Sequence, residues 1–357
     1  MARLARAEVI DPGEIAIAHV VNRVVRRCFL MGDDPVSGKN FDHRKVWIEE
    51  LLEHFAAFFG IDLIGYAILS NHYHLVLRSR PDVVKTWSDE EVARRWLMIC
   101  PVRKVGGKPA TPSQAEIDSI RNCPVRLADV RSRLSNLSWW MRLLNQRIAQ
   151  RSNLEDEQSG RFWEGRFRLA KLIDEESLLA CMVYVDLNPI RAAMVEKLEE
   201  SDFTSVQRRI QAEQQTTGVA EICSNKESVS KRRDAFLAKL TIDPTNDAVG
   251  PSPSDTPDRC SDKGVLELSA RDYFELADWT ARQVVPGKRG CTPEDTPSVL
   301  QRLGLAPKCW RELMEHFEDA FIHLAGRSDR IDSARSHQTA RRFRVSPLAR
   351  TLLPSAA

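Results

Sequence analysis

Two histidines separated by a single residue are the first feature of this sequence that could do chemistry. His72 and His74 flank Tyr73 in a run typical of a β-strand, HYHLVLR at 72–78. Residues two apart on a strand face the same side, so both imidazoles project together and Tyr73 points to the opposite face. Two imidazoles placed in this way can share one divalent cation. Ordinary packing produces the same pattern, so the pair needs support from elsewhere in the chain.

A tyrosine and an asparagine one helical turn apart form the second candidate. The chain has only four tyrosines, and Tyr184 is followed four residues later by Asn188, which places both side chains on one helix face. A tyrosine beside a metal can attack a phosphodiester, because the cation polarises the phosphate and stabilises the charge of the transition state. In the alternative interpretation, Tyr184 is a packing residue and Asn188 is an N-cap before Pro189.

A third segment alternates arginines with aromatic residues, RFWEGRFR at 161–168, and Lys171 follows it. Guanidinium groups bind phosphates and aromatic faces stack on unpaired bases, a combination that suits single-stranded nucleic acid. Over residues 100–171, fourteen lysines and arginines stand against seven acidic residues, although the whole chain carries a net charge of only +2. A solvated edge strand would show the same alternation.

The elements that must position these residues alternate between strand and helix periodicity, which predicts an α+β fold. Asp174 is the expected N-cap of the helix that carries Tyr184, and Pro189 is expected to end that helix. In chain order, the predicted elements are a strand region at 14–30, a helix at 43–59, strands at 61–69 and 72–78, a long helix at 127–148, an extended segment at 160–173, a helix at 174–188 and a short helix at 190–198.

At 357 residues, the chain is longer than one average domain, and 43% hydrophobic with 29% charged residues is the composition of a chain that folds. We expect a first domain over 1–205 with an insertion at about 81–124. A polar, Ser-, Thr- and Pro-rich stretch over 206–264 predicts a largely disordered linker. A small, mainly helical module over 265–326 and a basic, arginine-rich tail over 327–357 complete the chain.

The sequence contains no long apolar run and its N-terminus lacks the apolar core of a secretory signal, so we expect a cytoplasmic protein with no membrane partner. Eight cysteines are scattered singly without a CxxC pair. This spacing argues against a zinc cluster and against a dense disulfide framework.

Taken together, the motifs resemble one family closely, the single-tyrosine transposases of the HUH superfamily, and within it the REP-associated tyrosine transposases. "HUH" stands for two histidines around a bulky hydrophobic residue, which is Tyr73 here. The resemblance covers about residues 14–200, interrupted at roughly 81–124. Its motifs, in order, are HVVNR at 19–23, GYAILSNHYHLVLR at 65–78, GRFWEGRF at 160–167 and YVDLNPIRAAMV at 184–195. Compact members of the family end soon after the last motif, whereas this chain continues.

The resemblance implies a ferredoxin-like antiparallel sheet, with helices on one face and the histidine pair on a central strand. It implies recognition of a hairpin in single-stranded DNA, cleavage to a 5′-phosphotyrosine link and a free 3′-OH, and strand transfer. By motif position, Tyr184 becomes the nucleophile, and His72, His74 and Asn188 become ligands of Mg²⁺ or Mn²⁺. A homodimer is compatible with the family. The candidate phosphate contacts are Arg161, Arg166, Arg168, Lys171 and Arg191, and the candidate stacking residues are Trp163 and Phe167.

Two other functions fit the same residues. One is a non-catalytic module that binds structured single-stranded nucleic acid, for which neither histidine would be needed. The other is a metal-dependent nuclease that releases its product without a protein-linked strand. The presence of both histidines, the tyrosine and the asparagine together favours the transposase.

Overall fold

The computed structural model describes residues 8–355, apart from 26–27, 36, 107, 223–230, 244, 246–257, 285–296 and 337–344. Much of the predicted linker and three arginines of the predicted tail, at 341, 342 and 344, lie outside the described residues. The described chain is an α+β fold built on one five-stranded, mostly antiparallel sheet, with a separate two-stranded hairpin.

The main sheet has the strand order β2-β3-β1-β6-β7, with β1 at its centre. Only the last pair, β6 with β7, is parallel. The predicted strand region at 14–30 is too long, because only seven of its residues form the strand. The strands are β1 (Ile17–Arg23), β2 (Ile61–Ile68), β3 (His72–Ser79), β6 (Arg168–Leu172) and β7 (Leu324–Ala325).

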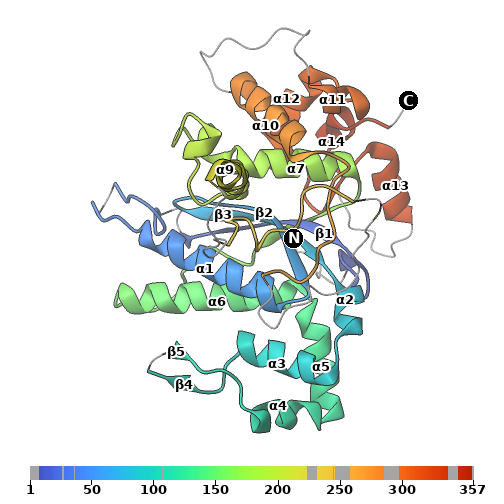
Figure 1. Cartoon of the computed structure of the whole chain (residues 1–357). Helices are drawn as coiled ribbons and strands as arrows, with labels where there is room; N and C mark the ends of the chain where they lie inside the picture. The colour runs from blue at the N-terminus through green and yellow to red at the C-terminus, as the bar shows by residue number, and fades with distance from the viewer. Residues whose placement is uncertain are drawn as a thin grey trace.

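Helices cover both faces of this sheet, so the expectation of helices on one face is wrong. In Figure 1, α1 (His43–Phe58) and α6 (Leu137–Glu155) lie below the sheet, and α7 (Glu175–Asp186) and α9 (Ser205–Ile222) lie above it. The physical reason is that β2 is buried along its whole length and β3 almost so. A strand that is apolar on both faces must be covered on both.

The predicted long helix at 127–148 is two helices, α5 (Pro124–Leu134) and α6. The break between the two helices lies at Asn136. Its side chain accepts a hydrogen bond from the backbone N–H of Ser138 and caps the start of α6. The apolar spacing of three and four continues across the break, so periodicity alone did not reveal it. The rest of the insertion, in the lower lobe of Figure 1, comprises α2 (Pro81–Thr86), α3 (Asp89–Ile99), the hairpin strands β4 (Lys104–Val105) and β5 (Lys108–Pro109), and α4 (Gln114–Arg121).

The described part of 206–264 differs from a disordered linker. Helix α9 occupies its start, and Leu237 is buried and bridges to Leu63 of β2. Phe236 and Cys260 are also buried in the core. The overall composition of the segment is polar, so it gave no indication that these few apolar residues pack against the sheet.

The C-terminal module shares its core with the first domain. Its helices α10 (Ala270–Val284), α11 (Ser298–Arg302) and α12 (Pro307–Ala320) pack in one apolar cluster with α7, and β7 extends the main sheet. The predicted tail is partly packed as well. Arg327 is buried and paired with Glu176 at 2.8 Å. The tail also contains α13 (Ser328–Ser336) and α14 (Pro347–Leu352).

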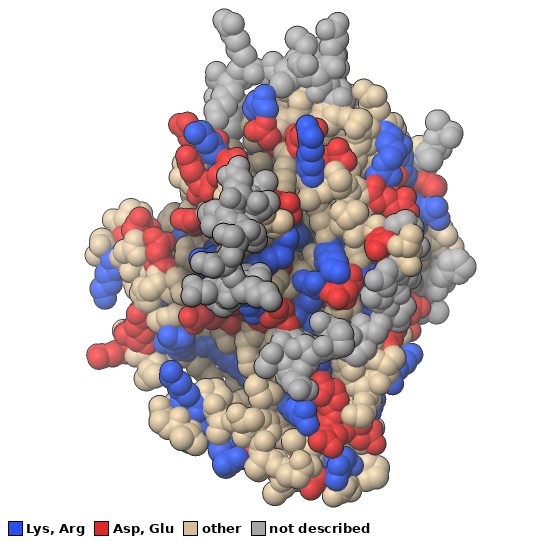
Figure 2. Space-filling view, in the orientation of Figure 1, with Lys and Arg blue, Asp and Glu red and all other residues tan. Residues whose placement is uncertain are grey.

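The surface mixes charges of both signs. On the face shown in Figure 2, basic and acidic side chains are interspersed, in agreement with the small net charge of the chain. In the part of the chain that the structure describes, no helix has both the length and the apolar character needed to cross a bilayer.

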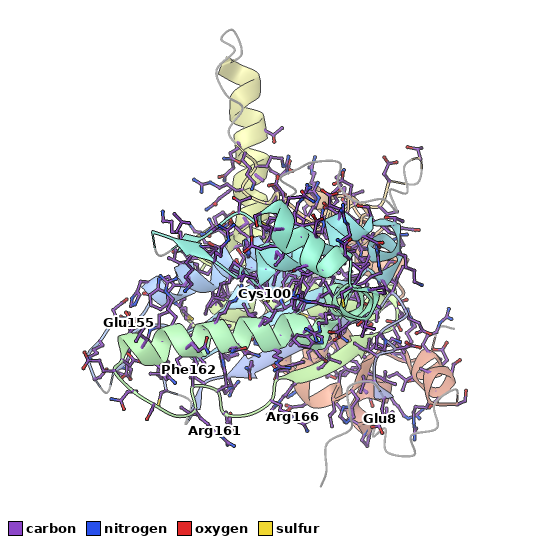
Figure 3. The ribbon with its side chains drawn as sticks, turned by 90° about the horizontal axis from the view of Figure 1, so that it is seen from below. Glu8, Cys100, Glu155, Arg161, Phe162 and Arg166 are labelled. Atoms are coloured by element: carbon purple, nitrogen blue, oxygen red, sulfur yellow. The ribbon has the colours of Figure 1, made fainter. Side chains whose placement is uncertain are left out.

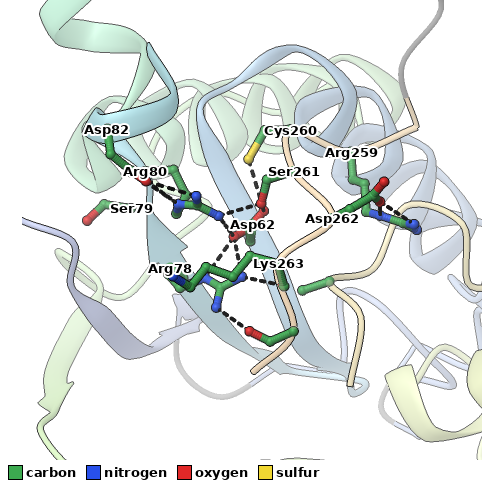
Figure 4. A network of polar contacts seen from close by, with 12 residues as sticks. Asp62, Arg78, Ser79, Arg80, Asp82, Arg259, Cys260, Ser261, Asp262 and Lys263 are labelled. Atoms are coloured by element: carbon green, nitrogen blue, oxygen red, sulfur yellow. Dashed lines mark hydrogen bonds and ion pairs between the residues drawn. The ribbon is translucent and has the colours of Figure 1, made fainter. Parts of the chain in front are cut away.

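A buried carboxylate ties the second half of the chain to the sheet (Figure 4). Asp62 on β2 accepts from Arg78 at 2.7 Å and from Arg80 at 3.3 Å, and both guanidinium groups are buried. Cys260 and Ser261 each donate to the other oxygen of Asp62 at 2.9 Å. Charges taken out of water are tolerated only when they are paired and hydrogen-bonded in this way.

Replacing Asp62 therefore has a large expected cost. Asp62→Ala leaves two buried guanidinium groups short of their shared carboxylate, and we expect a loss of about 3–5 kcal/mol in the free energy of unfolding. Urea unfolding followed by circular dichroism measures it. The matched control is Asp89→Ala, whose exposed carboxylate pairs with the partly exposed Arg131 at 2.6 Å and is expected to cost about 1 kcal/mol or less. Equal stability of the two variants would contradict this account.

Candidate active site

Strand register places the candidate residues on one face of the sheet. Val21 of β1 lies opposite His74 on β3 and opposite Arg168 on β6, and Arg23 lies opposite His72. Directly opposed residues on neighbouring strands share a face, so His72, His74 and Arg168 point to the same side. His19, two residues before Val21, shares that face. This is the face that α7 covers.

Each ring of the histidine pair is fixed through its Nδ1 atom. The ring centroids of His72 and His74 are 4.9 Å apart. His72 Nδ1 is 2.5 Å from the side-chain oxygen of Asn71, and His74 Nδ1 is 3.0 Å from Nε2 of His19. The His19 ring also stacks on His74, with centroids 5.2 Å apart and an interplanar angle of 6°. His74 Nε2 is buried and has no hydrogen-bond partner, so the nitrogen that a metal would use is available.

The electrostatic surroundings keep these imidazoles neutral. Burial, reinforced by the charge of Arg23, lowers the pKa of His72 to about 4, and burial lowers the pKa of His74 well below its usual value. Metal ligation requires neutral imidazole, so the two rings suit a divalent cation. Among the described residues, however, no three His, Cys, Asp or Glu side chains converge closely enough to form a complete ligand set.

Tyr184 reaches His74 and His19 from α7. Its ring centroid is 5.8 Å from that of His74 and 6.1 Å from that of His19. The hydroxyl donates to Glu318 Oε1 at 3.0 Å, and the Arg191 guanidinium lies 4.7 Å from the ring centroid. Burial and the nearby charge of Glu318 raise the pKa of Tyr184, so the phenol keeps its proton at neutral pH.

The spacing predicted that Asn188 lies on the same helix as Tyr184, but that helix, α7, ends at Asp186. Asn188 is the first residue of the short helix α8 (Asn188–Arg191), and Leu187 takes the N-cap position. The side-chain amide of Asn188 donates to the backbone oxygen of Tyr184 at 3.1 Å, so it is tied to the helix end that precedes it. Its role as a third metal ligand stays a prediction. The short helix expected at 190–198 ends at Arg191.

The basic, aromatic segment has its arginines outside and its aromatic rings inside. Arg161, Arg166 and Arg168 are exposed, and Figure 3 shows the first two on the segment that runs beside α6. Phe167 is buried, so its prediction as a stacking surface for bases is wrong. Trp163 is half-buried, donates from Nε1 to the backbone oxygen of Asn145, and meets Tyr73 edge-on. The alternation of the segment positions aromatic residues for packing, which sequence spacing cannot distinguish from an open stacking surface.

The predicted phosphate contacts divide into two groups. Arg191 lies at Tyr184 and also donates to the backbone oxygen of Glu315 at 3.2 Å. Arg168 lies 3.7 Å from Glu318, which accepts from the Tyr184 hydroxyl. Arg161 and Arg166 lie on the surface segment, and Lys171 is 3.8 Å from Glu14. The structure therefore brings two of the five cations to the surroundings of Tyr184.

Sequence reasoning missed three residues of this site. His19 is the histidine of the HVVNR motif on β1, and a third histidine within the motifs was a signal that could have placed it beside the histidine pair. Phe317 and Glu318 carried no signal, because they lie about 130 residues after Tyr184 in a module that the motifs do not cover.

No protein-family model and no curated protein matches the chain. A solved structure described as a REP-associated tyrosine transposase bound to a REP hairpin is similar to it at 12% sequence identity, covering 64% of this chain and 96% of that chain, with a TM-score of 0.32. The proposal for this chain therefore rests on its motifs and on the geometry of the histidine–tyrosine site.

Proposed function

We propose that this protein is a metal-dependent tyrosine transposase that nicks and rejoins single-stranded DNA carrying a hairpin. The observation that carries the proposal is the contact of Tyr184 with His74 of the histidine pair, from elements more than 100 residues apart, together with the buried Nε2 of His74, which has no hydrogen-bond partner. A buried imidazole nitrogen without a partner costs free energy that a bound metal ion would recover. The strand order β2-β3-β1-β6 supports a ferredoxin-like catalytic domain.

His72 and His74 would hold Mg²⁺ or Mn²⁺ through Nε2, with Asn188 as the proposed third ligand. When bound there, the cation would supply charge to polarise the scissile phosphate. The Tyr184 oxygen forms a bond to phosphorus as the bond from phosphorus to the 3′ oxygen breaks. The phenol releases its proton and the departing 3′ oxygen takes one up, so the protein keeps a 5′-phosphotyrosine link and the other strand ends in a 3′-OH. The reverse attack rejoins strands without a nucleotide cofactor.

DNA as the substrate follows from the motif resemblance and from the cations around the tyrosine. We assign Arg168 and Arg191 to the phosphate under attack, and Arg161, Arg166 and Lys171 to the flanking backbone. Because Phe167 is buried and Trp163 is half-buried, we do not assign Phe167 a stacking role and expect binding to depend mainly on phosphate contacts and therefore on salt.

The covalent step is tested with Tyr184→Phe. The probe is a 3′-fluorescent pool of single-stranded oligonucleotides with a hairpin and randomised flanks, incubated with the full chain and Mn²⁺ and separated on a denaturing protein gel. Tyr184→Phe keeps the stacked ring and loses only the nucleophile, so we expect adduct formation to fall by at least about a thousandfold.

The matched control is Tyr73→Phe, because Tyr73 lies between the two histidines but faces the other side of the sheet. It should form adduct within about threefold of the natural protein. An undiminished adduct with Tyr184→Phe would refute the assignment of the nucleophile. Cleaved DNA with no protein-linked strand would favour a nuclease, and hairpin binding that is indifferent to Mn²⁺ and to loss of either histidine would favour a binding module.

A second experiment tests the metal site without DNA. His19 fixes the ring orientation of His74, so His19→Ala should weaken Mn²⁺ binding by about 10- to 100-fold. His19→Gln should retain most of the affinity, because a side-chain amide can reach the same ring nitrogen. Titration calorimetry of the full chain with MnCl₂ measures both variants. Equal Mn²⁺ affinity of His19→Ala and the natural protein would show that His19 has no such role.

A further inference from the structure

Helix α12 of the C-terminal module lies directly on the proposed nucleophile. Phe317 stacks on Tyr184, with ring centroids 5.2 Å apart and an interplanar angle of 25°, and meets His19 edge-on at 5.8 Å. Phe317 and Tyr184 are both buried. A residue of the C-terminal module therefore fixes the plane of the tyrosine ring.

The module is also joined to the sheet and to the N-terminal end of α7, the opposite end from Tyr184. Leu172 of β6 pairs with Ala325 of β7, and the backbone N–H of Arg327 donates to Asp174, the N-cap of α7, at 2.6 Å. Within the module, the indole N–H of Trp310 on α12 donates to Thr280 on α10 at 3.0 Å. Together with the apolar cluster that α12 shares with α7, these contacts fasten α12 to the rest of the fold.

Glu318 carries the contact to the tyrosine hydroxyl. Its Oε1 accepts from Tyr184 at 3.0 Å and lies 3.6 Å from Nδ1 of His74, and its Oε2 lies 3.7 Å from the Arg168 guanidinium. The Glu318 side chain is 23% exposed, so this carboxylate lies where the buried site meets solvent. It thus touches the proposed nucleophile, a proposed metal ligand and a proposed phosphate contact.

We propose that Glu318 is a positioning residue for Tyr184, which makes the C-terminal module a working part of the tyrosine site. The proposal rests on the proposed function. A phenol hydroxyl prefers to lie in the ring plane and can point in either of two directions, and a hydrogen bond donated to a fixed acceptor selects one direction for its proton and therefore for its lone pairs. Holding a nucleophile in a reactive orientation is among the larger contributions that a protein makes to rate. Phe317 fixes the ring and Glu318 fixes the hydroxyl.

Three variants of α12 separate this role from simple packing. Glu318→Ala should lower the rate constant of adduct formation at saturating oligonucleotide by at least about tenfold while the hairpin affinity changes by less than about threefold. Glu318→Gln should stay within about threefold of the natural rate, because its amide oxygen still accepts from the phenol. Glu315→Ala is the matched control, an exposed glutamate one turn earlier on the same helix.

Rates with Glu318→Ala equal to or above the natural rate would overturn the proposal, and a faster rate would show that Glu318 obstructs the tyrosine. A Glu318→Gln variant as slow as Glu318→Ala would overturn it too, because charge and not hydrogen bonding would then set the rate. If the natural protein forms no adduct in any of these conditions, the proposed function fails instead.

A spectroscopic measurement tests the contact without DNA. Full-length protein labelled with 3-fluorotyrosine has four labelled sites, and Tyr184→Phe identifies the ¹⁹F signal of Tyr184. Fluorine beside the hydroxyl senses its hydrogen bond, so the signal should shift in Glu318→Ala, return towards its original position in Glu318→Gln and stay in place in Glu315→Ala. An unmoved signal in Glu318→Ala would overturn the proposed contact.

Discussion

The antiparallel pairing of β1 with β3 and β6 is the constraint on which the site depends. It places His19, His74 and Arg168 on one face and the apolar residues Ala18 and Val20 on the other. Side-chain direction alternates along a strand, so a slip of one residue would exchange the two sets and bury cations in the core. The apolar residues of β1 therefore hold the register that the polar residues use.

Burial of the second face follows from the same sheet and gives the site its electrostatic character. Because β2 and β3 are buried on both sides, α7, α9 and the C-terminal module cover the face that carries the histidines. Removal from water keeps the imidazoles neutral and the phenol protonated. The C-terminal module, which contains none of the sequence motifs, thus helps to set the protonation state of the histidines and the tyrosine in those motifs.

Local patterns predicted the local structure of the first domain well. The helix at 43–59 and the strands at 61–69 and 72–78 are present with bounds close to those expected, because each has a clear period and a clear stop. The pattern could not show the break at Asn136, which depends on one capping hydrogen bond, or the inward orientation of Phe167, which depends on packing against distant residues. The covered second face and Glu318 depend on contacts between segments far apart in sequence, and no spacing within a motif reports such contacts.

The identity of the residue that becomes linked to DNA tests the central claim most directly. After reaction with a hairpin oligonucleotide in Mn²⁺, nuclease and trypsin digestion followed by mass spectrometry locates the remaining phosphonucleotide. The account predicts that it lies on Tyr184, in the peptide covering 172–191. A link to Tyr66, Tyr73 or Tyr273, or cleavage that leaves no residue modified, would contradict it.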